Sequence, residues 1–206
     1  MEIIVENLSV HTEENCRLGA ISFHLKDGDH AVVTGVSGSG KTTLFRVLTG
    51  LEPEYRGKAV FWSEDKGELT PQSFRDQEGI GFLFQENRLL PERSAVENVR
   101  ITLRNEIADA AIRQELSKVL PETDPDRPAG KLSGGEQRRV ALVRAMLQKS
   151  KVILLDEPFS GLDEGAGDLV KKYISEKGEG RIVLASDHEG FHFPDWIRIN
   201  VASGKD

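Results

Sequence analysis

The apolar positions of the chain fall into short runs, and the spacing within each run predicts the element that it forms. Positions 2–10 and 20–25 alternate apolar and polar residues ahead of a turn at 27–29, which predicts two antiparallel strands. Positions 30–34 are a β-branched run suited to a buried strand, and positions 42–49 have the character of a helix that Gly50 ends. The chain therefore begins with strands, a glycine-rich loop and a helix.

Later apolar runs predict further strands, and these lie on both sides of a helical segment. The predicted strands are 58–62, 79–85, 151–155, 181–186 and 196–201. Between residues 86 and 147 the spacing becomes helical, because Ser94 and Glu97 form a capping box and apolar residues recur every four positions from Ala108 to Leu120. We therefore predict an α/β fold with an antiparallel β subdomain and an inserted helical subdomain.

The loop between the strand 30–34 and the following helix fits the phosphate-binding pattern G-x-x-x-x-G-K-[ST]. It reads Gly35-Val36-Ser37-Gly38-Ser39-Gly40-Lys41-Thr42, followed by Thr43. Glycines let the backbone curl so that its N–H groups point inward, and the helix N-terminus adds partial positive charge. Lys41 is placed for the β- and γ-phosphates of ATP and Thr42 for Mg²⁺. The alternative is a glycine-rich turn that only caps a helix.

Polar side chains follow two other predicted strands. Gln85 ends one, and Asp156 and Glu157 end the apolar run 152–155. Ligands of open α/β sheets bind at the carboxyl ends of strands. Gln85 is therefore a candidate for the nucleotide site. Asp156 can bind Mg²⁺ through water, and Glu157 can orient or deprotonate the attacking water. The alternative is that these side chains are strand-end groups in solvent.

A second glycine-rich helix start lies at Leu132-Ser133-Gly134-Gly135-Glu136, where Ser133 and Glu136 form a capping box. Its N–H groups predict a second anion site, and the alternative is an ordinary capped helix. Downstream, 160–163 forms a tight turn, and His188 follows the strand 181–186. His188 could touch the γ-phosphate or lie free on the surface. His24, His30 and His192 receive no role.

Composition narrows the class of protein. With 206 residues, 38% of them hydrophobic, the chain can bury one full core. The net charge is −7 without a long basic run, so we expect no nucleic-acid partner. The single cysteine, Cys16, excludes an internal disulfide and most simply serves as a packing residue. The longest apolar run, 152–155, is too short to cross a membrane. We expect a cytoplasmic protein.

Taken together, these motifs resemble those of an ATP-binding-cassette (ABC) ATPase subunit over residues 2–204. The resemblance rests on six ordered motifs: the loop 35–42, Gln85, the signature 132–136, Asp156-Glu157, the turn 160–163 and His188. It implies a Mg²⁺-dependent ATPase with the phosphate-loop NTPase core of that family. It also implies that two subunits pack head to tail, so that Ser133 and Gly135 of one close over ATP on the other.

The resemblance assigns further roles and marks three departures. It implies that Gln85 senses Mg²⁺ and water, that Asp163 links the two sites, and that His188 steadies the γ-phosphate. The family's usually aromatic adenine-stacking position corresponds to His11, which could instead be an exposed strand-end histidine. Asp187 stands where Ser or Thr is usual before His188. The helix after Asp163 carries two early glycines and is expected to be short.

The resemblance also predicts domain organisation and partners. We expect one ABC ATPase domain over 1–206, with 1–87 and 148–206 as nucleotide-binding core and 88–147 as helical subdomain. Its partners would be a second ATPase subunit and integral membrane permease subunits, on the cytoplasmic face of the membrane. The stretch 84–91 is similar to ATPases of nitrate, taurine and aliphatic-sulfonate importers, and 84–98 would face the permease.

Several alternatives stay open. An exporter or lipoprotein-extracting complex uses a similar ATPase. A chromosome or DNA-repair ATPase of the family carries a long heptad coil between phosphate loop and signature, which this chain lacks. A translation factor of the family usually carries two cassettes. A small-molecule phosphoryl-transfer enzyme would not need the signature.

Overall fold

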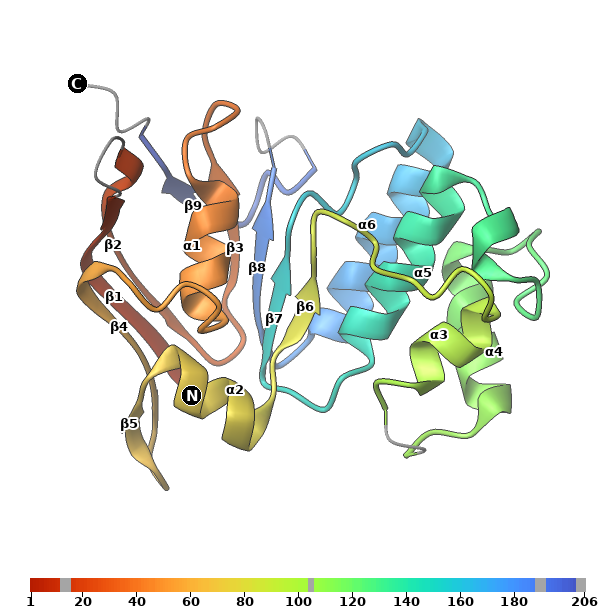
Figure 1. Cartoon of the computed structure of the whole chain (residues 1–206), viewed down its shortest axis with the longest axis horizontal. Helices are drawn as coiled ribbons and strands as arrows, with labels where there is room; N and C mark the ends of the chain where they lie inside the picture. The colour runs from red at the N-terminus through yellow and green to blue at the C-terminus, as the bar shows by residue number, and fades with distance from the viewer. Residues whose placement is uncertain (12–15, 104–105, 188–191, 203–206) are drawn as a thin grey trace.

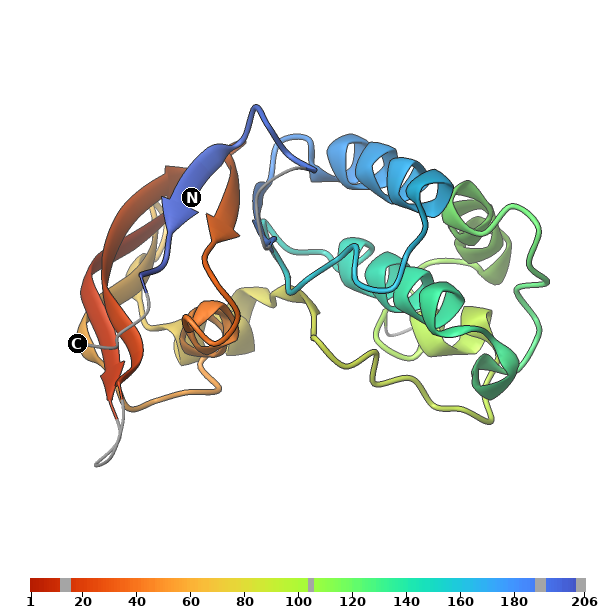
Figure 2. The same ribbon diagram turned by 90° about the horizontal axis from the view of Figure 1, so that it is seen from above.

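Two sheets of different character lie on either side of helix α1 (Lys41–Leu48) (Figure 1). The computed structural model describes residues 1–11, 16–103, 106–187 and 192–202. In the view from above, the antiparallel sheet stands at one end of the molecule and the helices of the second half at the other (Figure 2). The parallel sheet lies between them and carries the loops that matter for function.

The antiparallel sheet has the strand order β2-β1-β4-β5. Its strands are β1 (Glu2–His11), β2 (Cys16–Lys26), β4 (Arg56–Ser63) and β5 (Gly67–Leu69). The alternation predicted from the sequence is confirmed, because Ile3, Val5 and Leu25 point inward and are at most 1% exposed. This sheet therefore presents one apolar face to α1.

The second sheet is parallel, with the strand order β6-β7-β8-β3-β9. Its strands are β3 (His30–Thr34), β6 (Gly81–Leu83), β7 (Val152–Leu155), β8 (Ile182–Ser186) and β9 (Ile197–Asn200). All residues of β7 and β8 are buried, as expected of strands covered on both faces. Because the strands are parallel, the loops after β3, β6, β7 and β8 lie along one edge.

The remaining helices complete the layers. They are α2 (Pro71–Glu78), α3 (Ala95–Arg100), α4 (Asp109–Val119), the 3₁₀ turn η1 (Ala129–Lys131), α5 (Gly134–Met146) and α6 (Glu164–Gly178). Helices α5 and α6 cover the face of the parallel sheet that lies opposite α1, and α3 and α4 pack outside them (Figures 1 and 2). The helical character predicted for 86–147 is thus confirmed.

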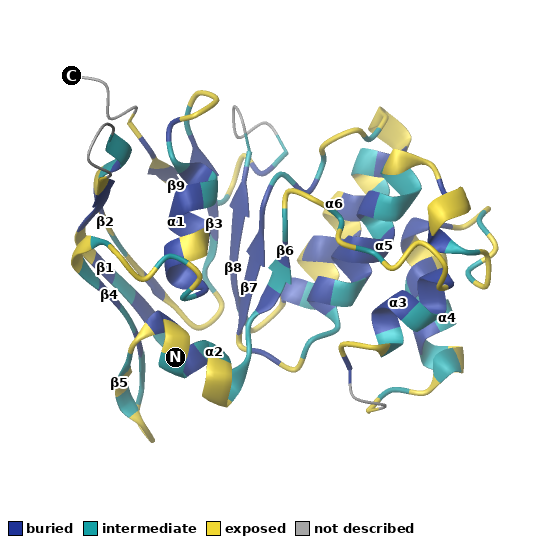
Figure 3. Ribbon diagram, in the orientation of Figure 1, coloured by how far each residue is buried: buried dark blue, intermediate teal, exposed yellow. Residues whose placement is uncertain are grey.

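Two hydrophobic cores lie on the two faces of the parallel sheet (Figure 3). One joins the antiparallel sheet and α1 to residues such as Val33 and Leu154. The other joins residues of the opposite face, such as Ile153 and Leu155, to α3, α4, α5 and α6. The edge that carries the loops is therefore anchored from both sides.

Three details differ from the predictions made from the sequence. The strand predicted at 79–85 is shorter, since β6 covers only Gly81–Leu83 and Gln85 lies in the loop beyond it. The polar stretch before it contains β5 and α2, whose Thr70 cap accepts a hydrogen bond from the Ser73 N–H. Short, mostly polar elements such as these give little periodic signal.

The prediction that the helix after Asp163 is short is wrong, because α6 spans 15 residues. Asp163 is its N-cap, and Asp163 Oδ1 accepts a hydrogen bond of 2.8 Å from the Ala166 N–H. Further along, Val170, Tyr173 and Ile174 bury one face. Capping and burial together outweigh the roughly 1 kcal/mol that each glycine costs.

Candidate nucleotide-binding site

The phosphate-binding loop joins β3 to α1, and two of its glycines are required by close packing. A Cβ on Gly35 would lie 2.5 Å from Ser39 Oγ and 2.6 Å from the Val201 carbonyl oxygen. Gly40 has φ +107°, and a Cβ there would lie 2.4 Å from the Arg17 carbonyl oxygen. Only glycine fits these positions without displacing backbone. The loop is therefore held in its curled form by the strands around it.

Lys41 begins α1 and turns back across the loop. Its Nζ donates hydrogen bonds to the carbonyl oxygens of Gly35 at 2.6 Å and Val36 at 3.2 Å. The residue is only 6% exposed. Gly40 is the N-cap of α1, and no side chain caps the helix start. The ammonium group and the helix N-terminus thus contribute positive charge at one point, which is the arrangement that an anion requires.

A cavity of about 460 Å³ opens beside this loop. It brings together Lys41, Thr42, Gln85 and Glu157, all predicted from the sequence although they are far apart along the chain. Its full lining is Cys16, Arg17, Ser37, Gly38, Gly40, Lys41, Thr42, Thr43, Gln85 and Glu157. Most of this lining is polar, as a nucleotide phosphate site would be.

The two adjacent carboxylates differ in their surroundings. Asp156 is 1% exposed, and its Oδ1 accepts a hydrogen bond of 2.7 Å from the Ser186 hydroxyl. Asp156 Oδ2 is buried and has no hydrogen-bond partner among the described residues. Glu157 has φ +51°, and its N–H donates to Ser186 Oγ at 2.8 Å. Sequence reasoning missed Ser186, although it is a polar residue at a strand end.

These groups suit Mg²⁺. A buried carboxylate oxygen without a partner is costly unless something else satisfies it. Mg²⁺ prefers oxygen ligands, and it is usually held by waters, substrate phosphates and one or two carboxylates of the protein. Asp156, the Thr42 hydroxyl and the Gln85 amide oxygen would be such a set, and no cluster of three or more His, Cys, Asp or Glu residues in the described ranges forms an all-protein metal site.

Ser133, Gly135 and Asp163 do not line this cavity. Ser133 is exposed at the start of α5. Gly135 lies against the turn before Asp163, since a Cβ on Gly135 would lie 3.1 Å from the Gly161 carbonyl oxygen. The signature and the turn 160–163 therefore form a second group, along the same edge of the molecule as the phosphate loop (Figure 1).

Two predicted site residues, His11 and His188, are not among the described residues that line the cavity. His11 is exposed at the end of β1 and pairs in register with Cys16, which lines the cavity, but His11 itself does not. Arg17, which sequence reasoning missed, also lines the cavity and forms an ion pair of 2.9 Å with Glu52. His188 lies outside the described residues.

A smaller cavity of about 150 Å³ adjoins Glu157 and includes His192, which the sequence left without a role. Nδ1 of His192 lies 3.1 Å from Asp187 Oδ2, and its ring stacks on Phe159 with 3.9 Å between centroids. Asp187, which stands where Ser or Thr is usual in the family, thus contacts a histidine whose ring stacks on Phe159.

The fold and the cavity define a phosphate-loop protein that binds nucleotide. A family model described as ABC transporter matches residues 18–160. The chain therefore belongs to the ABC transporter family, as an ATP-binding cassette that hydrolyses ATP.

Known relatives agree with this family. The chain is 36% identical over 189 residues to the lipoprotein-releasing system ATP-binding protein LolD of Nitratidesulfovibrio vulgaris, covering 86% of this chain and 81% of LolD. It is 36% identical over 161 residues to the aliphatic sulfonates import ATP-binding protein SsuB of Escherichia coli K12, covering 78% and 60%.

One solved structure illustrates the shared fold. The ATP-binding cassette MJ0796, in a dimeric post-hydrolysis state bound to ADP and Pi, superposes with a TM-score of 0.80. It is 23% identical, with 98% of this chain and 95% of that chain covered. At this identity the likeness concerns the fold alone.

Proposed function

We propose that this chain is the ATPase subunit of a membrane transporter and that it works as a head-to-tail dimer closed by Mg-ATP. In that dimer the phosphate loop of one chain binds ATP, and Ser133 and Gly135 of the other contact the γ-phosphate. The observation that carries the proposal is the separation of the two anion-binding groups. The phosphate loop lines the cavity beside Lys41, whereas the second group, at the exposed start of α5, lies outside that cavity.

At each nucleotide site of the proposed dimer, we assign the following roles. Lys41 and the loop N–H groups bind the β- and γ-phosphates, and Thr42, Gln85 and Asp156 hold Mg²⁺, which would stabilise charge on the phosphates. The Glu157 carboxylate orients the attacking water and accepts its proton. His188 contacts the γ-phosphate, and Asp163 links the two sites of the dimer. His11 stacks on the adenine.

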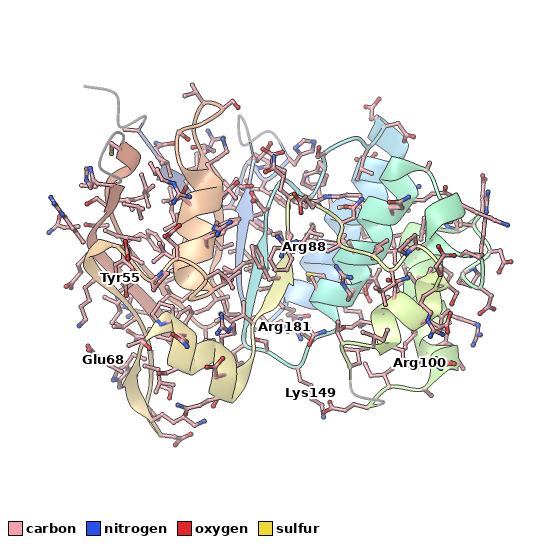
Figure 4. The ribbon with its side chains drawn as sticks, in the orientation of Figure 1. Tyr55, Glu68, Arg88, Arg100, Lys149 and Arg181 are labelled. Atoms are coloured by element: carbon pink, nitrogen blue, oxygen red, sulfur yellow. The ribbon has the colours of Figure 1, made fainter. Side chains whose placement is uncertain are left out.

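A second groove suits the permease. It is a cavity of about 400 Å³ whose apolar lining includes Ile80, Phe82 and Phe84. Arginines line it as well, and the Arg88 guanidinium lies 3.9 Å from the centre of the Phe84 ring (Figure 4). In the described ranges, no helix is long and apolar enough to cross a membrane. We propose that a short permease helix with apolar side chains and a carboxylate docks here.

The groove can be tested by co-expression with the permease. Leu51 lines the groove and is 42% exposed. Leu51→Arg adds bulk and charge to the apolar surface and should abolish co-purification with the permease while ATP binding persists. Co-purification at the parent level would contradict this docking site. Ile197→Arg, at another exposed apolar residue outside the groove, is the matched control.

The two curated relatives differ in what their names say they serve, one a lipoprotein-releasing system and the other an importer. Both names describe an ATP-binding protein, and we propose for this chain only the function of powering a transporter. Among importers, the similarity of residues 84–91 favours a small sulfonate-like or nitrate-like anion as substrate. Transport assays with the cognate permease in vesicles, using a sulfonate, nitrate and a lipoprotein as cargo, separate these cases.

The dimer can be tested with a hydrolysis-deficient variant. Glu157→Gln keeps the size of the side chain but removes the proton acceptor, so turnover should fall by orders of magnitude while ATP stays bound. Light scattering should then give a dimer mass in Mg-ATP and a monomer mass in ADP. Adding Ser133→Arg should return the protein to a monomer with ATP still bound.

A matched control separates the interface from general damage. Ser117→Arg introduces the same change at an exposed serine of α4, and the Glu157→Gln protein carrying it should still dimerise. A Glu157→Gln chain that stays monomeric in saturating Mg-ATP, alone and with its permease, would contradict the head-to-tail mechanism.

A further inference from the structure

Arg138 is a buried cation between the two loops that carry Gln85 and Glu157. It lies in the second turn of α5 and is 3% exposed. Burial lowers its pKa to about 10, although the nearby Asp156 and Glu157 raise it. The guanidinium therefore stays charged at neutral pH. Burying a charge is costly unless it is fully hydrogen-bonded, so its partners show what it does.

The partners of Arg138 belong to two different loops. Its Nη1 donates to the carbonyl oxygens of Phe84 at 2.5 Å and Gln85 at 3.1 Å, and to Asn87 Oδ1 at 3.2 Å. Its Nη2 donates to the carbonyl oxygens of Asp156 and, at 3.1 Å, of Glu157. One planar group thus joins the loop after β6 to the turn after β7.

The position of Arg138 follows from the sheet. Strands β6 and β7 pair up to Leu83 and Leu155, and the Asp156 N–H still donates to the Leu83 carbonyl oxygen at 2.9 Å. Beyond this point no backbone hydrogen bond between described residues joins the two segments. Arg138 connects the two segments beyond this point, because its guanidinium donates hydrogen bonds to backbone carbonyl groups of both. A fork of several donors can do this, whereas a single ammonium cannot span both loops.

Glu157 needs such support because its backbone is unusual. Its φ of +51° is in the left-handed region, which non-glycine residues rarely adopt. Such a conformation persists only where the surroundings enforce it. Ser186 Oγ accepts from the Glu157 N–H, and the Glu157 carbonyl oxygen accepts from Arg138 and from the Ser160 N–H at 3.0 Å. Arg138 is the contact that comes from α5.

We propose that Arg138 is a positioning residue for ATP hydrolysis. It holds the Gln85 loop and the Glu157 turn at the spacing that hydrolysis requires, and it fixes both to the helix that begins at Ser133. The proposal rests on the proposed roles of Gln85 and Glu157. Arg138 does not itself line the nucleotide cavity, and its hydrogen bonds to Gln85 and Glu157 are to their backbone carbonyl oxygens, so ATP binding should not depend on it.

The test compares Arg138→Met with Arg181→Met in the full chain. Arg181 is a matched control, because it donates to the Met146 and Gln148 carbonyl oxygens at 2.7 Å each, at the far end of α5 (Figure 4). Arg138→Met should lower kcat by about 10²-fold, as a misplaced catalytic group does, with the Kd for ATP within about threefold of the parent value. Arg181→Met should lower Tm and leave kcat within about twofold.

A double-mutant cycle distinguishes positioning from general destabilisation. If Arg138 acts through Glu157, adding Arg138→Met to Glu157→Gln should not lower the residual kcat further. An additional fall equal to that in the parent would overturn the claim that Arg138 acts through Glu157, and a parent-like kcat in Arg138→Met would overturn the whole proposal. If Glu157→Gln alone keeps the parent rate, the role proposed for Glu157 is wrong, and this result is separate from any result on Arg138.

Arg138→Lys covers the case in which the methionine variant does not fold. The lysine keeps the charge but can reach only one loop at a time, so kcat should fall at least about tenfold with KM unchanged. A folded Arg138→Lys protein with the parent kcat would overturn the proposal.

Discussion

Helices α1 and α5 both start in a glycine-rich turn, but their N-termini are completed in different ways. At α1 the N-cap is Gly40 in a left-handed conformation, with no side-chain cap and no acidic residue in the first turn. At α5 the Ser133 hydroxyl accepts from the Glu136 N–H at 3.2 Å, and the Glu136 carboxylate accepts from the Ser133 N–H at 2.7 Å. The start of α1 therefore has no side-chain cap, whereas the start of α5 has the two reciprocal hydrogen bonds of a capping box.

This difference in capping gives the two helix N-termini different local charge. The start of α1 keeps its positive end for an anion and adds the Lys41 ammonium beside it. The start of α5 carries the negative charge of Glu136, which offsets its helix dipole. The first has the charge to bind a phosphate group by itself. In the proposed dimer, the second would contact a phosphate that the other chain already binds. Three predictions test this comparison, from the largest expected effect to the smallest.

Lys41→Ala should have the largest effect. It removes the cation at the α1 start, so ATP binding and turnover should both be lost. Binding is measured by calorimetry and turnover by phosphate release. Lys66→Ala, which removes an exposed lysine paired with Glu78, should change neither. ATP hydrolysis at the parent rate in Lys41→Ala would mean that α1 does not bind the nucleotide.

Substitutions at His11 should have an intermediate effect and show whether the α1 side also binds the base. If the imidazole stacks on adenine, His11→Ala should weaken ATP binding by roughly 1–3 kcal/mol, and His11→Tyr should bind at least as well as the parent. His24→Ala, at a surface histidine of β2 paired with Glu2, should bind ATP normally. Equal affinities for all four proteins would exclude stacking by His11.

Glu136→Gln should have the smallest effect and concerns the α5 start. Hydrogen bonds from the Thr123 hydroxyl and the Ser133 N–H lower the pKa of the Glu136 carboxyl from its usual 4.5. Because the folded protein prefers the carboxylate, this stabilisation is present above pH 4.5 and is lost as pH falls through the lower folded value. The glutamine variant should therefore be less stable at pH 7 by about 0.3–1 kcal/mol.

Urea denaturation of the parent and Glu136→Gln proteins at a series of pH values measures this difference. The two stabilities should converge as the pH falls below the lowered pKa of the Glu136 carboxyl in the parent protein. A gap that stays constant over this range would show that the charge of Glu136 does not stabilise the α5 start.

Some parts of the structure were predictable because they depend on local chemistry. The alternation in 2–10, the buried run 152–155 and the capping boxes at Ser94 and Ser133 each specify an element through neighbours within a few residues, and the structure contains all of them. The phosphate loop was predictable for the same reason. Its glycines and Lys41 are consecutive, and the strand and helix beside it have clear periodicity.

Other features depended on contacts between distant segments, which local patterns do not record. The length of α6 follows from burial of Val170 and Tyr173, although its early glycines suggested a short helix. Ser186 meets Asp156, and His192 meets Phe159, only because β7 and β8 end side by side. No local pattern in the sequence distinguishes Arg138 from the other charged residues of α5. The tertiary structure buried it where two strands separate, and a single group could there satisfy carbonyls of both loops.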